Sequence, residues 1–239
     1  LHRVDRRQRQ MCIRDRYKCV DGIAIICTDP NDKETISLVN SDFPIVIIDM
    51  INEHTSTVTS DNVTGCKAAI KYLYDLGHRK IAHIYGTSKI DNWPSTVRKK
   101  AYIESMKEFN LEIPDGYLAD GVNFDFSGGY DAMKKLLKLD DRPTAVLSSS
   151  DKIALGAIEA IKEAGLRVPE DISVIGFDDI ELAKYVTPKL TTVRQNCDEI
   201  GRAAVDILVE QINKKEKLKI NKVVPVELIV RESCSKIDN

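Results

Sequence analysis

Short apolar runs alternate with longer amphipathic stretches along this chain. The runs are brief and rich in β-branched residues, which is typical of buried strands. Strands that alternate with amphipathic helices form βα units around a parallel sheet, so the pattern predicts an α/β fold. The expected strands are 23–27, 45–48, 81–85, 145–148 and 174–177.

Three of the amphipathic stretches carry signals for where a helix starts or stops. The first is expected to end at Gly77, which can adopt the left-handed conformation of a C-terminal stop. The second is expected to begin near Asp151 and to end before Gly165. The third opens at Asn196, and Glu199 lies at the spacing of a capping box. No long linker or repeat divides the chain, so any two lobes must be interleaved.

The composition is that of an ordinary globular protein. The chain has 239 residues, of which 43% are hydrophobic and 30% charged, so it can bury a core in one domain or two lobes. The formal net charge of -2 gives no overall positive field for nucleic acid. The sequence has no apolar stretch of membrane-span length and no apolar core of a secretion signal. Its six cysteines form no Cys-x-x-Cys pair, so we expect reduced thiols and a cytoplasmic location.

Residues 1–16 stand apart from the rest. They contain six arginines without a helical or strand period, and they stop where the βα pattern begins. We expect this segment to be adapter-derived, non-native sequence outside the fold. The alternative is a basic arm that binds phosphates, but the segment lacks the aromatic or helical framework of a specific reader.

The segment 172–179 is the most informative part of the chain. Its β-branched strand stops at Gly176 and brings Phe177 and two carboxylates, Asp178 and Asp179, to the carboxyl end. Open α/β sheets bind their ligands at the carboxyl ends of their strands. Asp178 is therefore a candidate ligand residue.

Six motifs occur in a characteristic order along the chain, at 20–23, 77–81, 142–145, 154–157, 172–179 and 187–193. Together they resemble the lactose/galactose repressor family of bacterial transcription regulators. The resemblance extends over about residues 19–232. It implies two interleaved Rossmann-like lobes with parallel sheets, like those of type I periplasmic binding proteins, with a ligand in the cleft between them.

The resemblance also implies boundaries for the lobes. The N-terminal lobe would comprise 17–77 and 195–219, and the C-terminal lobe 78–194 and 220–239. Family members carry a helix-turn-helix headpiece, a hinge helix, and a first strand and helix ahead of the segment that starts here near Tyr17. On this comparison the chain is truncated, and we expect an exposed sheet edge and poor solubility.

Asp178 and Arg98 match family residues that contact the effector. A carboxylate can accept hydrogen bonds from adjacent sugar hydroxyls, although a strand-end aspartate can also serve a turn. Arg98 matches the arginine that projects into the cleft, a task suited to a planar fork of donors. The residues after it, 99–102, depart from the family's Leu-Ala-Gly-Phe, and a solvated helix charge is the alternative.

Two aromatic residues are candidates for stacking on a ligand ring. Phe124 matches the family aromatic that stacks on a sugar, although a core role and the nearby Phe126 compete with this assignment. Trp93, the only tryptophan, lies in the loop before Arg98 and is expected to be a second platform or a rim residue.

Three polar residues complete the expected ligand site. Ser150 would face the cleft, with Asp151 beside it as the N-cap of a helix. Gln195 lies at the expected crossing between the lobes. Thr64 occupies a position at which some relatives place an effector contact, and a structural role at a helix start is the alternative.

The sequence carries no signature of catalysis or of a cofactor. Ser148-Ser149-Ser150 lacks the Gly-x-Ser-x-Gly elbow of hydrolases, and Gly128-Gly129 is neither a dinucleotide fingerprint nor a phosphate loop. The four histidines lack the spacing of metal ligands. We therefore expect no enzyme, no metal and no cofactor.

The resemblance implies the effector-binding and dimerisation part of a repressor. Its ligand would be a small polar effector, a sugar or else a purine, that favours one lobe orientation in a homodimer. Operator DNA would be bound only through the headpiece absent from this chain, and no membrane partner is expected. The rival hypothesis is a sugar-binding receptor of an ABC transport system, and a weaker third is a hydrolase or transferase on the same frame.

Overall fold

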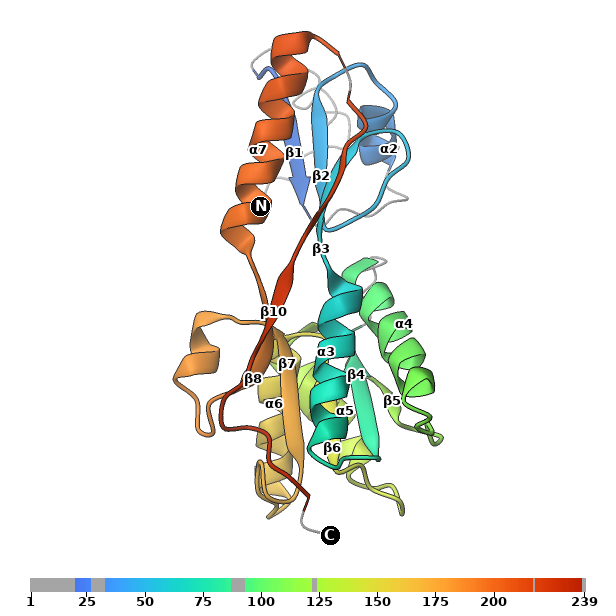
Figure 1. The fold of residues 1–239 in the computed structure, drawn as a ribbon, viewed down its shortest axis with the longest axis vertical. Coiled ribbons are helices and arrows are strands. Elements are labelled where there is room, and N and C mark those ends of the chain that lie inside the picture. Colours follow the sequence, from blue (N-terminus) through green and yellow to red (C-terminus); the bar gives the residue numbers. More distant parts are fainter. Residues whose placement is uncertain (1–19, 27–32, 87–92, 122–123, 217, 238–239) are drawn as a thin grey trace, which may run out of the picture. The chain divides into compact units, whose positions relative to one another are not determined.

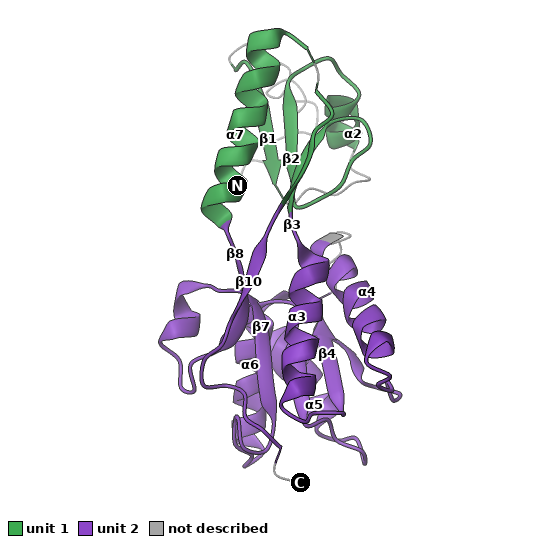
Figure 2. Ribbon diagram, viewed as in Figure 1, with its two compact units in different colours: residues 1–59, 197–223 green, residues 60–196, 224–239 purple. Residues whose placement is uncertain are grey.

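The computed structural model describes residues 20–26, 33–86, 93–121, 124–216 and 218–237, without the side chain of Trp93. The expected non-native segment, 1–16, lies outside the described residues. The chain forms two compact units, which Figure 2 distinguishes by colour. Unit 1 contains the described residues up to 59 and 197–223, and unit 2 contains 60–196 and 224–239.

Unit 1 is built on a four-stranded sheet in the order β1-β2-β3-β9. β1 (Ile23–Ile26), β2 (Ile45–Ile48) and β3 (Ser56–Ser60) are parallel, and β9 (Asn221–Val224) lies beside β3. The described residues of unit 1 also form a short helix, α2 (Lys33–Val39), and a longer one, α7 (Cys197–Lys214). Helix α7 runs along β1 and β2 (Figure 1). All four residues of β2 are buried, as the apolar run predicts.

Unit 2 contains a six-stranded sheet in the order β10-β8-β7-β6-β4-β5. Its strands are parallel except β10, which pairs antiparallel with β8 at one edge. The expected α/β class with parallel sheets is confirmed. The strands are β4 (Ile81–Tyr85), β5 (Leu118–Asp120), β6 (Ala145–Ser148), β7 (Ser173–Asp178), β8 (Thr191–Gln195) and β10 (Val226–Ile229).

Helices cover both faces of the unit 2 sheet. On β7, Val174 belongs to one core cluster, whereas Ile175 and Phe177 belong to the other, because successive side chains of a strand point to opposite faces. The first cluster includes the inner faces of α5 (Phe126–Leu136) and α6 (Asp151–Glu163). The second includes those of α3 (Asn62–Asp75) and α4 (Trp93–Glu108). A short 3-10 helix, η2 (Glu181–Lys184), follows β7.

The units divide the chain differently from the expected lobes. The expected boundary at 77/78 placed α3 in the first lobe, but α3 belongs to unit 2, which starts at residue 60. Its apolar face, with Ile70 and Leu73, is buried in the core that also holds residues of α4 and β7. Amphipathic spacing predicted that this face is buried, but it carries no information about which sheet covers it.

The helix ends follow local chemistry, with one exception. Gly77 and Gly165 have φ angles of 94° and 77°, so both adopt the left-handed stop that was predicted. The exception is the start of α6, where Asp151 was expected to be the N-cap. Ser150 holds that position instead, and its hydroxyl accepts a hydrogen bond from the backbone N–H of Ile153. Asp151 is the first helical residue, and its side chain bonds elsewhere.

Candidate functional site

The turn after β7 has an unusual backbone. Asp178 and Asp179 have φ angles of 117° and 57°, in the region that L-residues rarely adopt. Such conformations cost about 1–3 kcal/mol each and persist only when the surroundings hold them, often at ligand sites. Contacts from neighbouring elements therefore fix this turn, which we call the Asp178 turn (residues 178–180).

Three residues expected to bind ligand meet at the Asp178 turn. Gln195, at the end of β8, donates from Nε2 to Oδ1 of Asp178 at 2.6 Å. Nη1 of Arg98, on α4, lies 3.4 Å from the same oxygen. The Asp178 side chain is 28% exposed, so a small molecule can reach it. Sequence positions 98, 178 and 195 are thus brought to one point at the carboxyl end of the sheet.

Arg98 is buried and held by several groups at once. It is 3% exposed, so the alternative of a solvated helix charge is wrong. Its Nε donates to Oδ1 of Asn62 at 2.7 Å, its Nη1 donates to the carbonyl of Ser149 at 2.6 Å, and its guanidinium lies 3.6 Å over the Phe177 ring. Among the described residues, none accepts a hydrogen bond from Nη2, which leaves these donors for a ligand.

His83 is linked to Arg98 through Ser149, whose carbonyl accepts from Arg98 and whose hydroxyl bonds to the His83 ring. Its Nδ1 is 2.8 Å from the carbonyl of Leu147, which can only accept, so Nδ1 carries the proton. Nε2 then accepts from the hydroxyl of Ser149 at 3.2 Å. Burial lowers the pKa of His83 to about 4, so the ring is neutral at physiological pH. No pattern in the sequence indicates this role, because a histidine inside a strand is more often a core residue.

Asp179 has a structural role. Its carboxylate accepts from Nε of Arg194 at 2.7 Å and from Nη2 of Arg231, and the Asp179 side chain is buried. Burial alone acts to raise the pKa of Asp179, but the hydrogen bonds from the two arginines outweigh it and hold the pKa below its usual range. The two arginines come from β8 and from the segment after β10, so this ion pair network joins the turn to that edge of the sheet.

Asp151 is a buried acid of the site that sequence reasoning assigned to a cap. Its Oδ2 accepts from the backbone N–H of Ile180 at 2.8 Å, and its Oδ1 accepts from the hydroxyl of Thr192 at 2.5 Å. Burial raises the pKa of Asp151 to about 7, and the negative charges of Asp178 and Asp179 act in the same direction, against the hydrogen bond from Thr192. A glycine inside β7, at Gly176, was the one available signal, because it marks a close approach.

The two phenylalanines of the 124–126 segment have different environments. Phe124, with a φ of 57°, packs its ring against Gly86 at the end of β4, where a Cβ would lie 1.9 Å from the ring. It therefore lies at the same end of the sheet as the Asp178 turn. Phe126 is exposed and lines a separate pocket over α5 and α6. The side chain of Trp93 lies outside the described residues.

The remaining candidates are tied to local structure. Ser150 is buried, and its hydroxyl caps α6. Thr64 is exposed in the first turn of α3, where its backbone N–H donates to Oδ1 of the N-cap Asp61 at 3.0 Å. Gln195 accepts at Oε1 from the hydroxyl of Ser60 at 2.6 Å, which fixes its amide toward Asp178.

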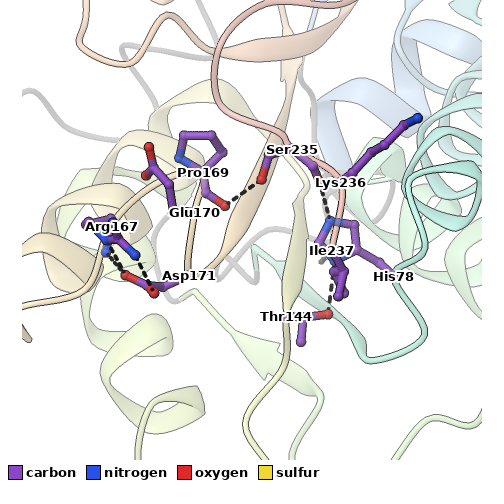
Figure 3. A pocket seen from close by; sticks show the side chains of 9 residues that line it. All are labelled: His78, Thr144, Arg167, Pro169, Glu170, Asp171, Ser235, Lys236 and Ile237. Carbon is purple, nitrogen blue, oxygen red and sulfur yellow. Dashed lines mark hydrogen bonds and ion pairs between the residues drawn. The ribbon is translucent and has the colours of Figure 1, made fainter. Parts of the chain in front are cut away.

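A second pocket lies at the opposite end of the unit 2 sheet, where β4, β6 and β7 begin. It has a volume of about 650 Å³, and the residues that line it are drawn in Figure 3. Its polar groups bond one another: His78 to Thr144 at 3.0 Å, Arg167 to Asp171, and Ser235 to the carbonyl of Pro169. This internal pairing indicates a structural cluster that anchors the segment after β10.

In the parts of the chain that the structure describes, no group of three or more His, Cys, Asp or Glu side chains is arranged to hold a metal ion. Across the same residues, no helix has both the length and the apolar character needed to cross a bilayer.

Comparisons with known proteins agree with this fold. The family model for the periplasmic binding protein-like domain matches residues 70–234. The ribose operon repressor of Escherichia coli (strain K12) is 40% identical over 200 residues, which are 82% of this chain and 60% of that protein. The chain thus spans about 60% of the length of this curated relative.

Two solved structures have the same fold as this chain. A regulatory protein of the LacI family from Chloroflexus aggregans superposes with a TM-score of 0.85 at 31% identity, covering 96% of this chain and 83% of that one. A LacI family transcriptional regulator from Enterococcus faecium, solved with bound ribose, has a TM-score of 0.82 at 27% identity, covering 96% and 85%.

These findings define the class of the protein as a periplasmic-binding-protein-like effector domain. The chain belongs to the LacI family of transcriptional regulators. The comparisons therefore support a regulatory domain over the transport receptor that was the rival hypothesis. These relatives are transcriptional regulators, and transcriptional regulators of this kind are not enzymes.

Proposed function

We propose that this chain binds a small neutral sugar at the Asp178 turn. The observation that carries the proposal is the convergence of Asp178, Arg98 and Gln195 at the carboxyl end of the unit 2 sheet. A carboxylate accepts from sugar hydroxyls, and the Nη2 donors of Arg98 can bond sugar oxygens. Phe124, at the same end of the sheet, supplies an apolar ring face, and Ser150, Thr64 and Trp93 stay candidates for secondary contacts.

Ribose is the first sugar to test. One relative is a ribose operon repressor, and one structural neighbour was solved with bound ribose. The negative charge of Asp178 favours a neutral sugar over a phosphorylated one, because two anions in a partly buried site repel each other. A purine base is the other ligand class to include in the panel.

Calorimetric titration of the chain with ribose, other sugars and purine bases tests the site. Asp178→Ala removes a charged acceptor, and such hydrogen bonds contribute roughly 1.5–3 kcal/mol each, so the affinity for the best ligand should fall about tenfold or more. Asp131→Ala, at an exposed position of α5, is the matched control and should bind like wild type. Equal affinity of Asp178→Ala and wild type would refute the site.

In the whole protein, we propose that effector binding changes the affinity of a DNA-binding segment for its operator in the cytoplasm. Coupling of this kind typically amounts to about 1–3 kcal/mol, or about a 5- to 150-fold change in affinity. Operator binding by the full-length protein, measured with and without the best ligand, tests the coupling. An operator affinity that does not change at saturating ligand would contradict it.

We propose that the whole protein is a homodimer and that unit 2 contributes to the interface. The exposed apolar side chains Phe126, Leu182 and Tyr185 lie near a pocket of about 620 Å³ formed by α5, α6 and the η2 segment. Tyr185 is 73% exposed, which favours a partner surface. Sedimentation of Leu182→Glu should give a lighter species than wild type, whereas Ile103→Glu, at an exposed position of α4, should not. A wild type that sediments as a monomer would refute the dimer.

A further inference from the structure

Asp151 connects two strands that carry the proposed effector site. It is fully buried at the first position of α6. One carboxylate oxygen accepts from the backbone N–H of Ile180, at the end of the Asp178 turn, and the other accepts from the hydroxyl of Thr192 on β8. Thr192 lies three residues before Gln195, the residue that holds Asp178. The Asp151 carboxyl group is thus bonded both to the Asp178 turn and to β8.

Gly176 provides the space for this carboxyl group. A Cβ at that position would lie 2.1 Å from Oδ1 of Asp151, a distance that real side chains do not reach. The Asp151 carboxyl group therefore lies against the backbone of β7 at Gly176, two residues before Asp178, and only glycine leaves room for it there. The φ angles of Asp178 and Asp179 need outside support, and the bond from Ile180 to Asp151 is part of it.

The charged groups around Asp151 come from several elements. The turn after β7 presents Asp178 and Asp179, both of which oppose a negative charge on Asp151. β8 presents the Thr192 hydroxyl to Asp151 and also carries Arg194. Arg194 and Arg231 both form ion pairs with Asp179. α5 packs against α6 through the backbone at Gly129, and Lys152, next along α6, is exposed. Burial and the two carboxylates raise the pKa of Asp151 to about 7, so both protonation states are populated at neutral pH.

We propose that Asp151 is a positioning residue whose ionised carboxyl group fixes the Asp178 turn and whose protonation loosens it. The ionised group offers two charged acceptors, and hydrogen bonds to a charged acceptor are roughly twice as strong as neutral ones. A protonated carboxyl group keeps one acceptor oxygen for the N–H of Ile180, but that oxygen no longer carries a negative charge. The protonated oxygen is then a donor, so the Thr192 hydroxyl must accept a hydrogen bond from it instead of donating one. The consequence for ligand affinity rests on the proposed function, because it requires that Asp178 contacts the effector.

Amide hydrogen exchange at Ile180 tests the role of Asp151 without any ligand. The probe is the exchange rate of this N–H, corrected for its intrinsic pH dependence, in wild type and in Asp151→Asn, which mimics the protonated acid. At pH 8 the variant should exchange several-fold faster than wild type, and at pH 6 the two should agree. Equal rates at pH 8, or the same ratio at both pH values, would overturn the proposal.

A second variant keeps the carboxyl group and moves its titration. Thr192→Val removes the hydroxyl that donates to Asp151, so the midpoint of the Ile180 exchange profile should shift to higher pH. The matched control is Thr191→Val on the same strand, where the buried hydroxyl accepts from the N–H of Arg231 instead. A midpoint that stays in place in Thr192→Val, or that moves equally in the control, would contradict the role of Asp151.

Ribose titration then extends the result to the effector. Wild-type affinity should fall several-fold from pH 8 to pH 6, and Asp151→Asn should keep the weaker affinity at both. Ribose affinity that is independent of pH in wild type would overturn the link between Asp151 and binding. If wild type binds no ribose, the proposed sugar fails, whereas the exchange of Ile180 still decides the role of Asp151.

Discussion

Although the ionised Asp151 carboxyl group holds the Asp178 turn locally, its ionisation is expected to reduce the free energy of unfolding of the whole chain, because burying the charge costs more than its two hydrogen bonds return. Its pKa is about 7 in the folded protein against an ordinary value of 3.8, so the folded state binds the proton more tightly. The stabilisation that comes from binding this proton is fully present below pH 3.8, the ordinary pKa, and is lost as the pH rises through about 7. Each pKa unit corresponds to about 1.4 kcal/mol, so Asp151→Asn should raise the free energy of unfolding at pH 8 by on the order of a few kcal/mol.

Urea unfolding at pH 8 and pH 5 measures this effect. The gain of Asp151→Asn over wild type should be largest at pH 8 and should shrink toward pH 5. A variant that is less stable than wild type at pH 8 would mean that the carboxylate stabilises the fold. Asp131→Asn, at an exposed position, serves as the control and should leave both values unchanged.

His83 titrates with the opposite sign. Burial lowers its pKa to about 4 from 6.5, so the unfolded chain takes up a proton first as the solution is acidified. Stability should therefore fall between pH 6.5 and pH 4, and His78, whose pKa burial also lowers, acts in the same direction. His83→Gln should flatten this acid slope in urea unfolding, whereas His54→Gln, at an exposed position, should not. An unchanged slope in His83→Gln would count against the buried neutral ring.

Residue types alone predicted one of the three converging residues. Asp178 follows a buried strand, so its place at the carboxyl end of the sheet follows from the pattern. Arg98 and Gln195 came from the family resemblance, because nothing in local spacing brings α4 to β7. Asp151 was assigned to a cap because Ser150 and Asp151 are both good capping residues. The hydrogen bonds of the Asp151 side chain to Ile180 and Thr192 distinguish its role from that of Ser150. These partners lie 29 and 41 positions from Asp151 in the sequence, so local patterns do not indicate them.

At the scale of elements, α5 and α6 approach each other closely through glycine. A Cβ on Gly156 would lie 2.0 Å from the carbonyl oxygen of Phe126, and one on Gly129 would lie 2.1 Å from that of Ile153. Backbone atoms cannot move aside as a flexible side chain can. Gly156→Ala should therefore destabilise unit 2 by about 1–3 kcal/mol or more.

A helical glycine without close neighbours is expected to show the opposite effect. Gly201 lies in α7 with nothing within 4 Å of an added Cβ. Gly201→Ala should stabilise by about 0.4–1 kcal/mol, because alanine loses less entropy on entering a helix. Urea unfolding of both variants measures the contrast. A stabilised Gly156→Ala would contradict the close packing of α5 on α6.

The apolar strands of the fold were predictable from the sequence, and the polar ones were not. Apolar runs of four or five residues predicted five strands, β1, β2, β4, β6 and β7, because a buried parallel strand is apolar on both faces. The allocation of α3 to unit 2 was not predictable, since an amphipathic helix buries its face equally well on either sheet. The other five strands, β3, β5, β8, β9 and β10, were missed, because polar or charged residues interrupt them, such as Glu227 in β10, and they do not form continuous apolar runs.

At the scale of the whole molecule, unit 1 presents an apolar edge. β1 is an edge strand of the sheet in the described residues, and Ile26 on it is 60% exposed. Exposed edges of this kind promote association between chains. Ile26→Lys should lower aggregation of this chain in light scattering without lowering its urea midpoint, whereas Ile103→Lys on α4 should have little effect. Equal aggregation of wild type and Ile26→Lys would shift attention to other surfaces.

The chain passes between the units at residues 59–60, 196–197 and 223–224. As the protein leaves the ribosome, β1 and β2 emerge well before α7 and β9 of the same unit, because the strands β4 to β8 of the other unit lie between them in the sequence. A nascent chain must therefore carry the apolar β2 without the cover of α7 until the segment that begins at Cys197 is synthesised. We expect that interval, and not the finished fold, to be when this protein depends most on chaperones.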